Sequence, residues 1–409
     1  MRHRIVALFI PLALCSCGLL EEQTVKLITD RPEMAAYVER FNARQTDVRV
    51  EIIYDEAPSQ ATFAGRVAGD MVIAQWLASP SIMAKFDSLA DIVKPSRIDP
   101  AWFYPGLLAM GSRDNRPILL PLSFSLPAIV SYRPSVTTDL PNLALPLDTM
   151  RAMGKAFNAT GKNGPAAIGF SPLWNSQFLF DAALLLGVRF RAGRNGQAVW
   201  DADALSRTVE LARSWITEVN GGAAADKVFA DRTLVQPSAK LLSTKKILFA
   251  LMPFAGYFSL PEEKRRNFDF RWLSDGKSIP VQDDVLLAGV LRSARNKGGA
   301  RAFLEWFFSP QTQRSLLEVN QSRRIGVFCI ANGFSSFKSI NEKDLPQKYP
   351  LLLGRIPPES LLVFPDTLPD DWTAVRDEVI GPWLGRSVAG EERQTLEKAL
   401  DEWRTAIKE

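Results

Sequence analysis

The sequence has very little histidine or cysteine. Its 409 residues include one histidine, His3, and three cysteines, Cys15, Cys17 and Cys329. If the N-terminus is removed during export, the remaining chain has no imidazole, which excludes Ser-His-Asp and Cys-His mechanisms and His-ligated zinc. One interior cysteine can build neither a disulfide framework nor a Cys-rich metal site. We therefore predict no metal and no cofactor, and expect carboxylates, aromatic rings, amides and backbone to carry the function.

An excess of charge of one sign is also missing. The chain has 49 Lys and Arg against 45 Asp and Glu, a formal net charge of +4. This balance argues against nucleic-acid binding, which needs a concentrated basic face. The length exceeds the roughly 250–300 residues at which single cores stop growing, so we expect two domains. The ten tryptophans are unusual, and each is either core or a flat apolar platform for a ligand.

Only one hydrophobic run is long enough to suggest a membrane-related role. Residues 5–14 are mostly apolar and follow two arginines, but they are too short for a spanning helix, which needs about 20 residues. They match a signal-peptide core. The following residues, 14–17, resemble a bacterial lipobox in which Cys17 is lipidated and becomes the new N-terminus. We therefore predict a signal peptide over 1–16, a lipidated tether over 17–23 and a membrane attachment through the lipid alone, with plain secretion as the alternative.

The first part of the chain has the pattern of an open α/β domain. Residues 25–29 predict a strand, 34–41 an amphipathic helix and 48–52 a second strand, which implies a parallel pair. Thr29 or Asp30 is expected to cap the helix. Residues 71–74 read as a buried central strand. The apolar stretch 118–132, interrupted by Pro121 and Pro127, is expected to run from one domain into the other.

Several blocks, in this order, carry a resemblance to a known family. They are residues 25–31, 69–76, 86–91, 120–132, 247–257, 302–317 and 372–375. Together with the lipobox they resemble the extracellular solute-binding proteins of ABC importers, in the sugar-binding branch that includes maltose-binding protein. The resemblance implies a two-lobed α/β fold (a venus flytrap), each lobe a mostly parallel sheet flanked by helices. Lobe one is expected over 24–122 plus 273–322 and lobe two over 123–272 plus 323–409, with the crossings acting as a hinge.

The resemblance also implies a function. A small solute, with carbohydrate the expected class, would bind between the lobes and be delivered to membrane permease subunits, without any bond being broken. We expect a monomer in the bacterial cell envelope, facing the periplasm or the exterior. The sequence has no P-loop, so any ATPase must be a separate chain.

Candidate ligand contacts lie where strands end. In open α/β sheets ligands meet the carboxyl ends of strands, which nominates Asp30, Arg31 and Trp76. The competing roles are a helix cap for Asp30 and rim packing for Trp76.

Further candidates come from the second half of the chain and from its similarity to the family. Trp174 and Asn175 precede a helix, where an indole face and an amide can recognise a sugar. Phe254 and Tyr257 follow the strand at 247–252, and Trp372 matches the family's C-terminal stacking tryptophan. Core packing is the competing role for these aromatic residues. Asp284, with its neighbour Asp283, could bind hydroxyls or a cation, or could lie in a solvated turn.

Other functions remain open at this point. A polyamine binder on the same fold would pair amines with acids and enclose the alkyl chain with tryptophan. A glycoside-active enzyme would need two carboxylates and no histidine. An interaction lipoprotein with an inactive cleft is a further alternative. Cys329 lies in an apolar stretch and is expected to be a buried, inert thiol.

Overall fold

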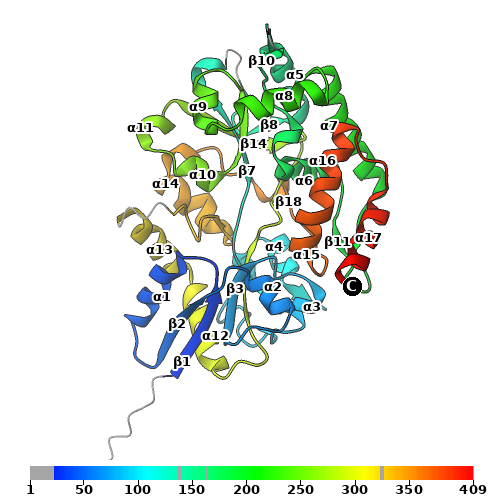
Figure 1. The fold of residues 1–409 in the computed structure, drawn as a ribbon. Helices are drawn as coiled ribbons and strands as arrows, with labels where there is room; N and C mark the ends of the chain where they lie inside the picture. The colour runs from blue at the N-terminus through cyan, green and yellow to red at the C-terminus, as the bar shows by residue number, and fades with distance from the viewer. Residues whose placement is uncertain (1–22, 137–139, 163, 323–326, 409) are drawn as a thin grey trace, which may run out of the picture.

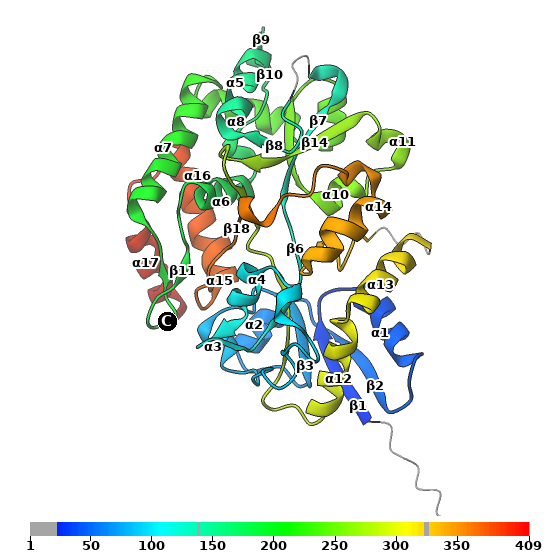
Figure 2. The same cartoon turned by 180° about the vertical axis from the view of Figure 1, so that it is seen from behind.

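The computed structural model describes residues 23–136, 140–162, 164–322 and 327–408, so the predicted signal peptide and Cys17 lie outside the described residues. These residues form two lobes, one above the other in Figure 1, joined by chain that runs between them. Figure 2 shows the same division from behind. The predicted two-lobed α/β fold is confirmed.

Lobe one is built on a six-stranded sheet in the order β17-β6-β16-β3-β1-β2. Its strands are β1 (Gln23–Thr29), β2 (Val48–Tyr54), β3 (Met71–Gln75), β6 (Leu120–Phe124), β16 (Leu286–Val290) and β17 (Phe334–Ser335). Strand β1 is parallel to β2 and β3, but β16 is antiparallel to β3 and to β6, and β17 is antiparallel to β6. The sheet is therefore mixed, which corrects the expectation of a mostly parallel one.

The helix after β1 buries the predicted stripe but starts differently. Helix α1 (Met34–Asn42) buries Met34, Tyr37, Val38 and Phe41. It begins after Glu33 without a side-chain cap, so the prediction that Thr29 or Asp30 caps it is wrong. The physical reason is a competing partner, because the Asp30 carboxylate accepts two hydrogen bonds from the Arg31 guanidinium.

Lobe two is built on a four-stranded sheet in the order β13-β7-β14-β8. Its strands are β7 (Pro127–Tyr132), β8 (Ala144–Pro146), β13 (Phe249–Pro253) and β14 (Phe268–Ser274). Strand β7 is antiparallel to both neighbours, while β14 and β8 are parallel. This sheet too is mixed rather than mostly parallel.

Three chain segments connect the lobes. The first joins β6 to β7, as the long stretch at 118–132 predicted. The second joins β14 to β16 and contains β15 (Ile279–Pro280), which pairs with β18 (Leu362–Val363) of the third. Because β17 still pairs with β6 of lobe one, the third crossing lies later in the chain than the expected boundary at 323.

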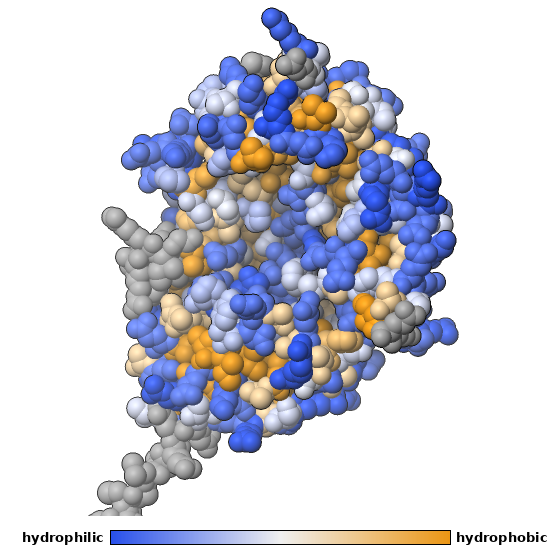
Figure 3. Space-filling view, in the orientation of Figure 1, coloured by the Kyte–Doolittle hydropathy of each residue, from blue (hydrophilic) through white to orange (hydrophobic). Residues whose placement is uncertain are grey.

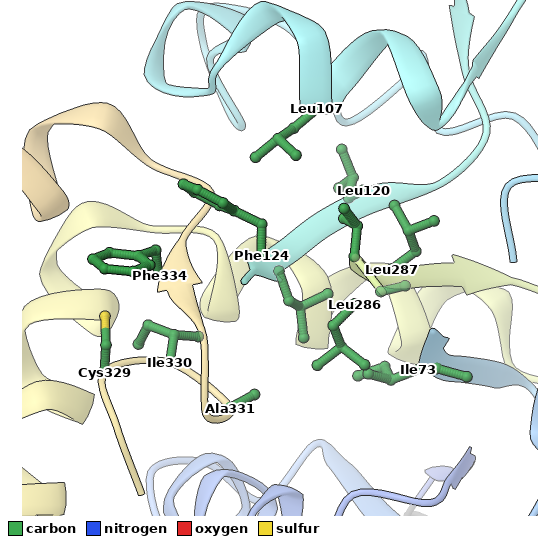
Figure 4. Close-up of a cluster of buried hydrophobic side chains, with 14 of the residues drawn as sticks. Ile73, Leu107, Leu120, Phe124, Leu286, Leu287, Cys329, Ile330, Ala331 and Phe334 are labelled. Carbon is green, nitrogen blue, oxygen red and sulfur yellow. The ribbon is translucent and has the colours of Figure 1, made fainter. Parts of the chain in front are cut away.

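Helices cover both sheets, and the buried apolar side chains form two cores. One large core fills lobe one and extends into lobe two, and a second lies among the lobe-two helices. Figure 4 shows part of the first core, where Cys329 lies buried with Ile330 and Phe334. Cys329 is 0% exposed, as predicted, and this burial raises the pKa of its thiol to about 12. Apart from short 3₁₀ and π-helical turns, the remaining helices and strands are α2 (Pro58–Phe63), α3 (Pro80–Met83), α4 (Pro105–Met110), α5 (Leu147–Phe157), α6 (Ser176–Leu185), α7 (Ala202–Glu218), α8 (Ala223–Thr233), α9 (Ser238–Ser243), α10 (Phe254–Phe258), α11 (Glu262–Arg265), α12 (Lys297–Phe307), α13 (Pro310–Ser322), α14 (Leu345–Lys348), α15 (Trp372–Ala374), α16 (Gly381–Ala389), α17 (Leu396–Lys408), and the short strands β4 (Ser112–Arg113), β5 (Arg116–Pro117), β9 (Ala159–Gly161), β10 (Gly164–Ala167), β11 (Arg191–Ala192) and β12 (Ala198–Val199).

In the described part of the chain, none of these helices has the length and apolar character needed to span a bilayer.

Candidate functional site

A cleft separates the two lobes and is visible as a hollow in the face shown in Figure 3. One cavity in it, of about 160 Å³, is lined by residues of both lobes. Arg31, Gln75 and Asp284 come from the strand ends of lobe one, and Pro253 and Ala255 come from lobe two. The carboxyl ends of β1 and β3 thus meet a turn of the opposite lobe, as expected for a ligand site in an open α/β sheet.

A second cavity, of about 270 Å³, brings two predicted tryptophans together. Trp76 directly follows β3 in lobe one, and Trp372 begins α15 in lobe two. The backbone of Trp76 has φ of 57°, an uncommon value for a non-glycine residue and one that is often found at functional sites. Its indole Nε1 is buried and has no hydrogen-bond partner among the described residues.

A chain of hydrogen bonds crosses the lobe-one side of the cleft. Arg31 Nη2 donates to Asp30 Oδ2 at 2.8 Å and to Gln75 Oε1 at 2.7 Å. Gln75 Nε2 in turn donates to Asp284 Oδ2 at 3.3 Å. Burial, assisted by the nearby Asp283 carboxylate, raises the pKa of Asp284 to about 6. Three predicted residues, Asp30, Arg31 and Asp284, therefore belong to one network.

The neighbouring acid faces the other lobe. Asp283 Oδ2 accepts hydrogen bonds from Trp372 Nε1 at 2.7 Å and from Arg376 Nε at 3.0 Å. The Arg376 guanidinium also lies 4.5 Å from the centre of the Phe180 ring and donates to Gln177. Arg376 was not among the predicted residues, although it follows Trp372 by four residues in a stretch whose sequence predicts a helix, a spacing that places two side chains on one helical face.

A fully buried acid lies behind this network. Asp181, on α6, is 2% exposed and accepts hydrogen bonds from Gln177 at 2.9 Å and Gln282 at 3.2 Å. Burial, with Asp283 as a like charge nearby, raises the pKa of Asp181 to about 8. At neutral pH its side chain is therefore mostly an uncharged acid. No three His, Cys, Asp or Glu side chains of the described segments lie together in a way that could hold a metal ion.

Comparison with known proteins decides the family. The pattern of the bacterial extracellular solute-binding proteins matches residues 27–314, which is more than half of the chain. The chain belongs to this family. No curated protein matches the sequence significantly.

Solved structures share the fold of this solute-binding protein over nearly its whole length. The cyclic α-maltosyl-1,6-maltose binding protein of Arthrobacter globiformis is 13% identical, with a TM-score of 0.65 over 93% of this chain and 96% of that one. An ABC substrate-binding protein of Listeria monocytogenes in complex with cycloalternan is 14% identical, with a TM-score of 0.66 over 95% and 98% of the two chains. The sugar-binding protein MalE of Xanthomonas citri is 13% identical, with a TM-score of 0.66 over 94% and 96%.

Two predicted contacts of the solute-binding protein lie away from these cavities. Trp174 donates its indole N–H to Asp226 at 2.9 Å and stacks on Phe229. Asn175 caps α6 by accepting a hydrogen bond from the backbone of Gln177. Neither residue is among those that line the two cavities. The structure therefore gives both side chains a structural role.

Two other predicted contacts lie in the core. Phe254 is 2% exposed and Tyr257 is 3% exposed, and both pack on Phe270. Both side chains therefore have the core-packing role that was the alternative for them, and neither lines either of the two cavities. Their neighbours Pro253 and Ala255 face the cleft instead.

Proposed function

We propose that the protein binds a carbohydrate in the inter-lobe cleft and delivers it to permease subunits of an ABC importer. The observation that carries the proposal is the pairing of Trp76 and Trp372, one from each lobe, around a single cavity. Flat apolar rings suit the C–H faces of a sugar, and a ligand that touches both lobes stabilises the form in which they are close. The similar solved structures described above include a cyclic α-maltosyl-1,6-maltose binding protein and a substrate-binding protein in complex with cycloalternan.

The charges of the cleft support an uncharged solute. Asp30 is paired with Arg31 at 2.8 Å and Asp283 with Arg376 at 3.0 Å. The opposite charges of each pair cancel, which leaves Asp284, bonded to the Gln75 amide, as the acid that lines the first cavity. A polyamine would need several unpaired carboxylates here, whereas sugar hydroxyls need only hydrogen-bonding groups.

The cleft contains hydrogen-bonding groups that a sugar could use. Asp283 Oδ1 and Asp284 Oδ1 are buried, and like the indole Nε1 of Trp76 they have no hydrogen-bond partner among the described residues. Buried polar groups without partners are costly, and solute hydroxyls would satisfy them. Asp284 lines the first cavity, Trp76 lines the second and Asp283 bonds Trp372, so these groups border the cleft in which a polyhydroxylated solute would bind.

One observation favours the alternative, a polyamine ligand. Asp371 and Glu378 also line the cavity between the tryptophans, and both are exposed at its rim. An amine placed there would meet carboxylates together with an indole face. The two solute classes therefore have to be separated by experiment.

We further propose that the protein acts without catalysis and is anchored by a lipid on Cys17, as a monomer. Asp181 is enclosed in the core, so it is not available as one of two glycosidase carboxylates. The lipobox-like residues 14–17 support the anchor, and the extracellular solute-binding family supports a location outside the cytoplasm.

A thermal-shift panel tests the solute class. The full-length protein in detergent is heated with maltose, maltotriose, mannobiose, putrescine and spermidine, each also followed by NMR for cleavage. A sugar at a hundredfold excess over its Kd should stabilise the fold by about 2.7 kcal/mol and remain intact. Stabilisation by a polyamine alone would support the alternative, and release of a cleaved sugar would refute a binding-only function.

A further inference from the structure

A short contact joins the two lobes beside the tryptophan cavity. Residues 78–81 of lobe one lie against residues 368–370 of lobe two, and we call this pair of segments the inter-lobe clasp. The Asp370 carboxylate accepts hydrogen bonds from the backbone N–H of Ser81 at 2.9 Å and from Ser81 Oγ at 2.5 Å. The backbone N–H of Leu368 donates to the carbonyl of Ala78 at 2.8 Å. Three hydrogen bonds therefore cross between the lobes at this point.

The lobe-two half of the clasp is held firmly by its own lobe. The backbone N–H of Asp370 donates to the carbonyl of Gly196 at 2.7 Å, and Ala192 donates to Thr367 at 2.9 Å. Gly196 has φ of +73° and lies so close that a β-carbon there would be 1.9 Å from Asp370 Oδ2. The hairpin of β11 and β12 thus fixes the position of the Asp370 carboxylate.

The lobe-one half of the clasp is continuous with the cleft. Trp76 lies two residues before Ala78 and packs against the lobe-two core. Trp372 lies two residues after Asp370 and lines the same cavity as Trp76. Both segments of the clasp are therefore direct extensions of the residues proposed to hold the solute.

We propose that the inter-lobe clasp holds the lobes together when no solute is bound. Its bonds are made entirely by the chain itself, and two of the three have a charged acceptor, which makes them stronger than neutral ones. The clasp must then open for a solute to enter the cleft, and it must open again for the solute to be released at a permease. A bound solute can close the lobes only while it is present, whereas the clasp closes the lobes of the empty protein.

Substitutions in the clasp of the empty, full-length protein test this proposal. Spin labels on exposed positions of the two lobes, Lys94→Cys and Arg207→Cys, report the inter-lobe distance in detergent by pulsed electron paramagnetic resonance. Native mass spectrometry verifies that no solute is bound. Asp370→Ala removes both bonds to Ser81, Ser81→Ala removes only the hydroxyl bond, and Asp366→Ala is the matched control, an exposed acid on the same segment.

We expect the inter-lobe distance to change in Asp370→Ala, to change less in Ser81→Ala and to stay constant in Asp366→Ala. Amide hydrogen exchange at Ser81 and Leu368 should become at least roughly tenfold faster in Asp370→Ala. A distance distribution in Asp370→Ala identical to the wild type would overturn the proposal. If Asp370→Ala does not fold, an inter-lobe distance in Ser81→Ala that is unchanged from the wild type would overturn the proposal instead. Since no solute is used, this result is independent of whether a carbohydrate is the ligand.

Discussion

The buried carboxyl group of Asp181 should make the stability of the protein depend on pH. Burial raises the pKa of Asp181 from its ordinary 3.8 to about 8 in the folded chain. Below pH 4 the group is protonated in the folded and the unfolded chain, and it makes no difference to stability. Between pH 4 and pH 8 the unfolded chain ionises while the folded chain keeps its proton, so the free energy of unfolding falls as the pH rises.

The size of this loss follows from the shift. Each pH unit between the two pKa values costs about 1.4 kcal/mol, so the loss reaches roughly 4 kcal/mol by pH 7. The side chain in Asp181→Asn cannot ionise, so this substitution should remove the loss of stability with rising pH. The asparagine is of nearly the same size and keeps an oxygen that accepts from Gln177, whose own amide oxygen is held by Arg376, while the amide of Gln282 can turn to accept from the new NH₂ group.

Urea unfolding of both proteins between pH 4.5 and pH 8 measures the effect. The stability of Asp181→Asn relative to the wild type should grow steadily as the pH rises. The control Asp203→Asn, an exposed acid at the start of α7, should differ from the wild type by a constant amount. A difference between Asp181→Asn and wild type that does not vary with pH would refute the reasoning, because it would mean that Asp181 ionises alike in both states.

The remaining predictions concern the core, the anchor and the cleft. Phe254→Ala should lower the free energy of unfolding by about 3–5 kcal/mol, measured by urea unfolding, because Phe254 is a core residue; a loss below about 1 kcal/mol would contradict its place in the core. Cys17→Ala should move the protein from the membrane to the soluble fraction on cell fractionation; a variant that stays in the membrane would contradict the lipid anchor. Asp283→Ala leaves Trp372 and Arg376 without their shared acceptor, and calorimetric titration should show about a tenfold loss of affinity for the sugar selected by the panel. An unchanged affinity would mean that the pairing does not organise the site.

Local patterns in the sequence predicted the elements well. The stripe of α1 and the two interrupting prolines of residues 118–132 are visible in short windows, and both features appear as expected. Strand direction was not predictable in this way. Strand β16 returns from lobe two and lies antiparallel to β3, a consequence of the path between the lobes that leaves no pattern in the residues themselves.

The site was predicted only in part because its contacts are long-range. Gln75 and Asp284 are 209 residues apart, so the bond between them has no signal in a short window. The turn after β13 shows a different limit. The turn borders the cleft, but α10 buries Phe254 in the core and presents Ala255 to the cleft.

Calorimetric titration of the full-length protein with the sugar selected by the panel tests the central claim most directly. The account predicts saturable binding at one site and a loss of about 2 kcal/mol, roughly 30-fold in Kd, in Trp76→Ala. The matched variant Trp174→Phe, whose indole lies outside both cavities, should bind as the wild type does. Two results would contradict the account: sugar binding that is unchanged in Trp76→Ala but weaker in Trp174→Phe, or a heat of binding that is seen with polyamines and not with the sugar.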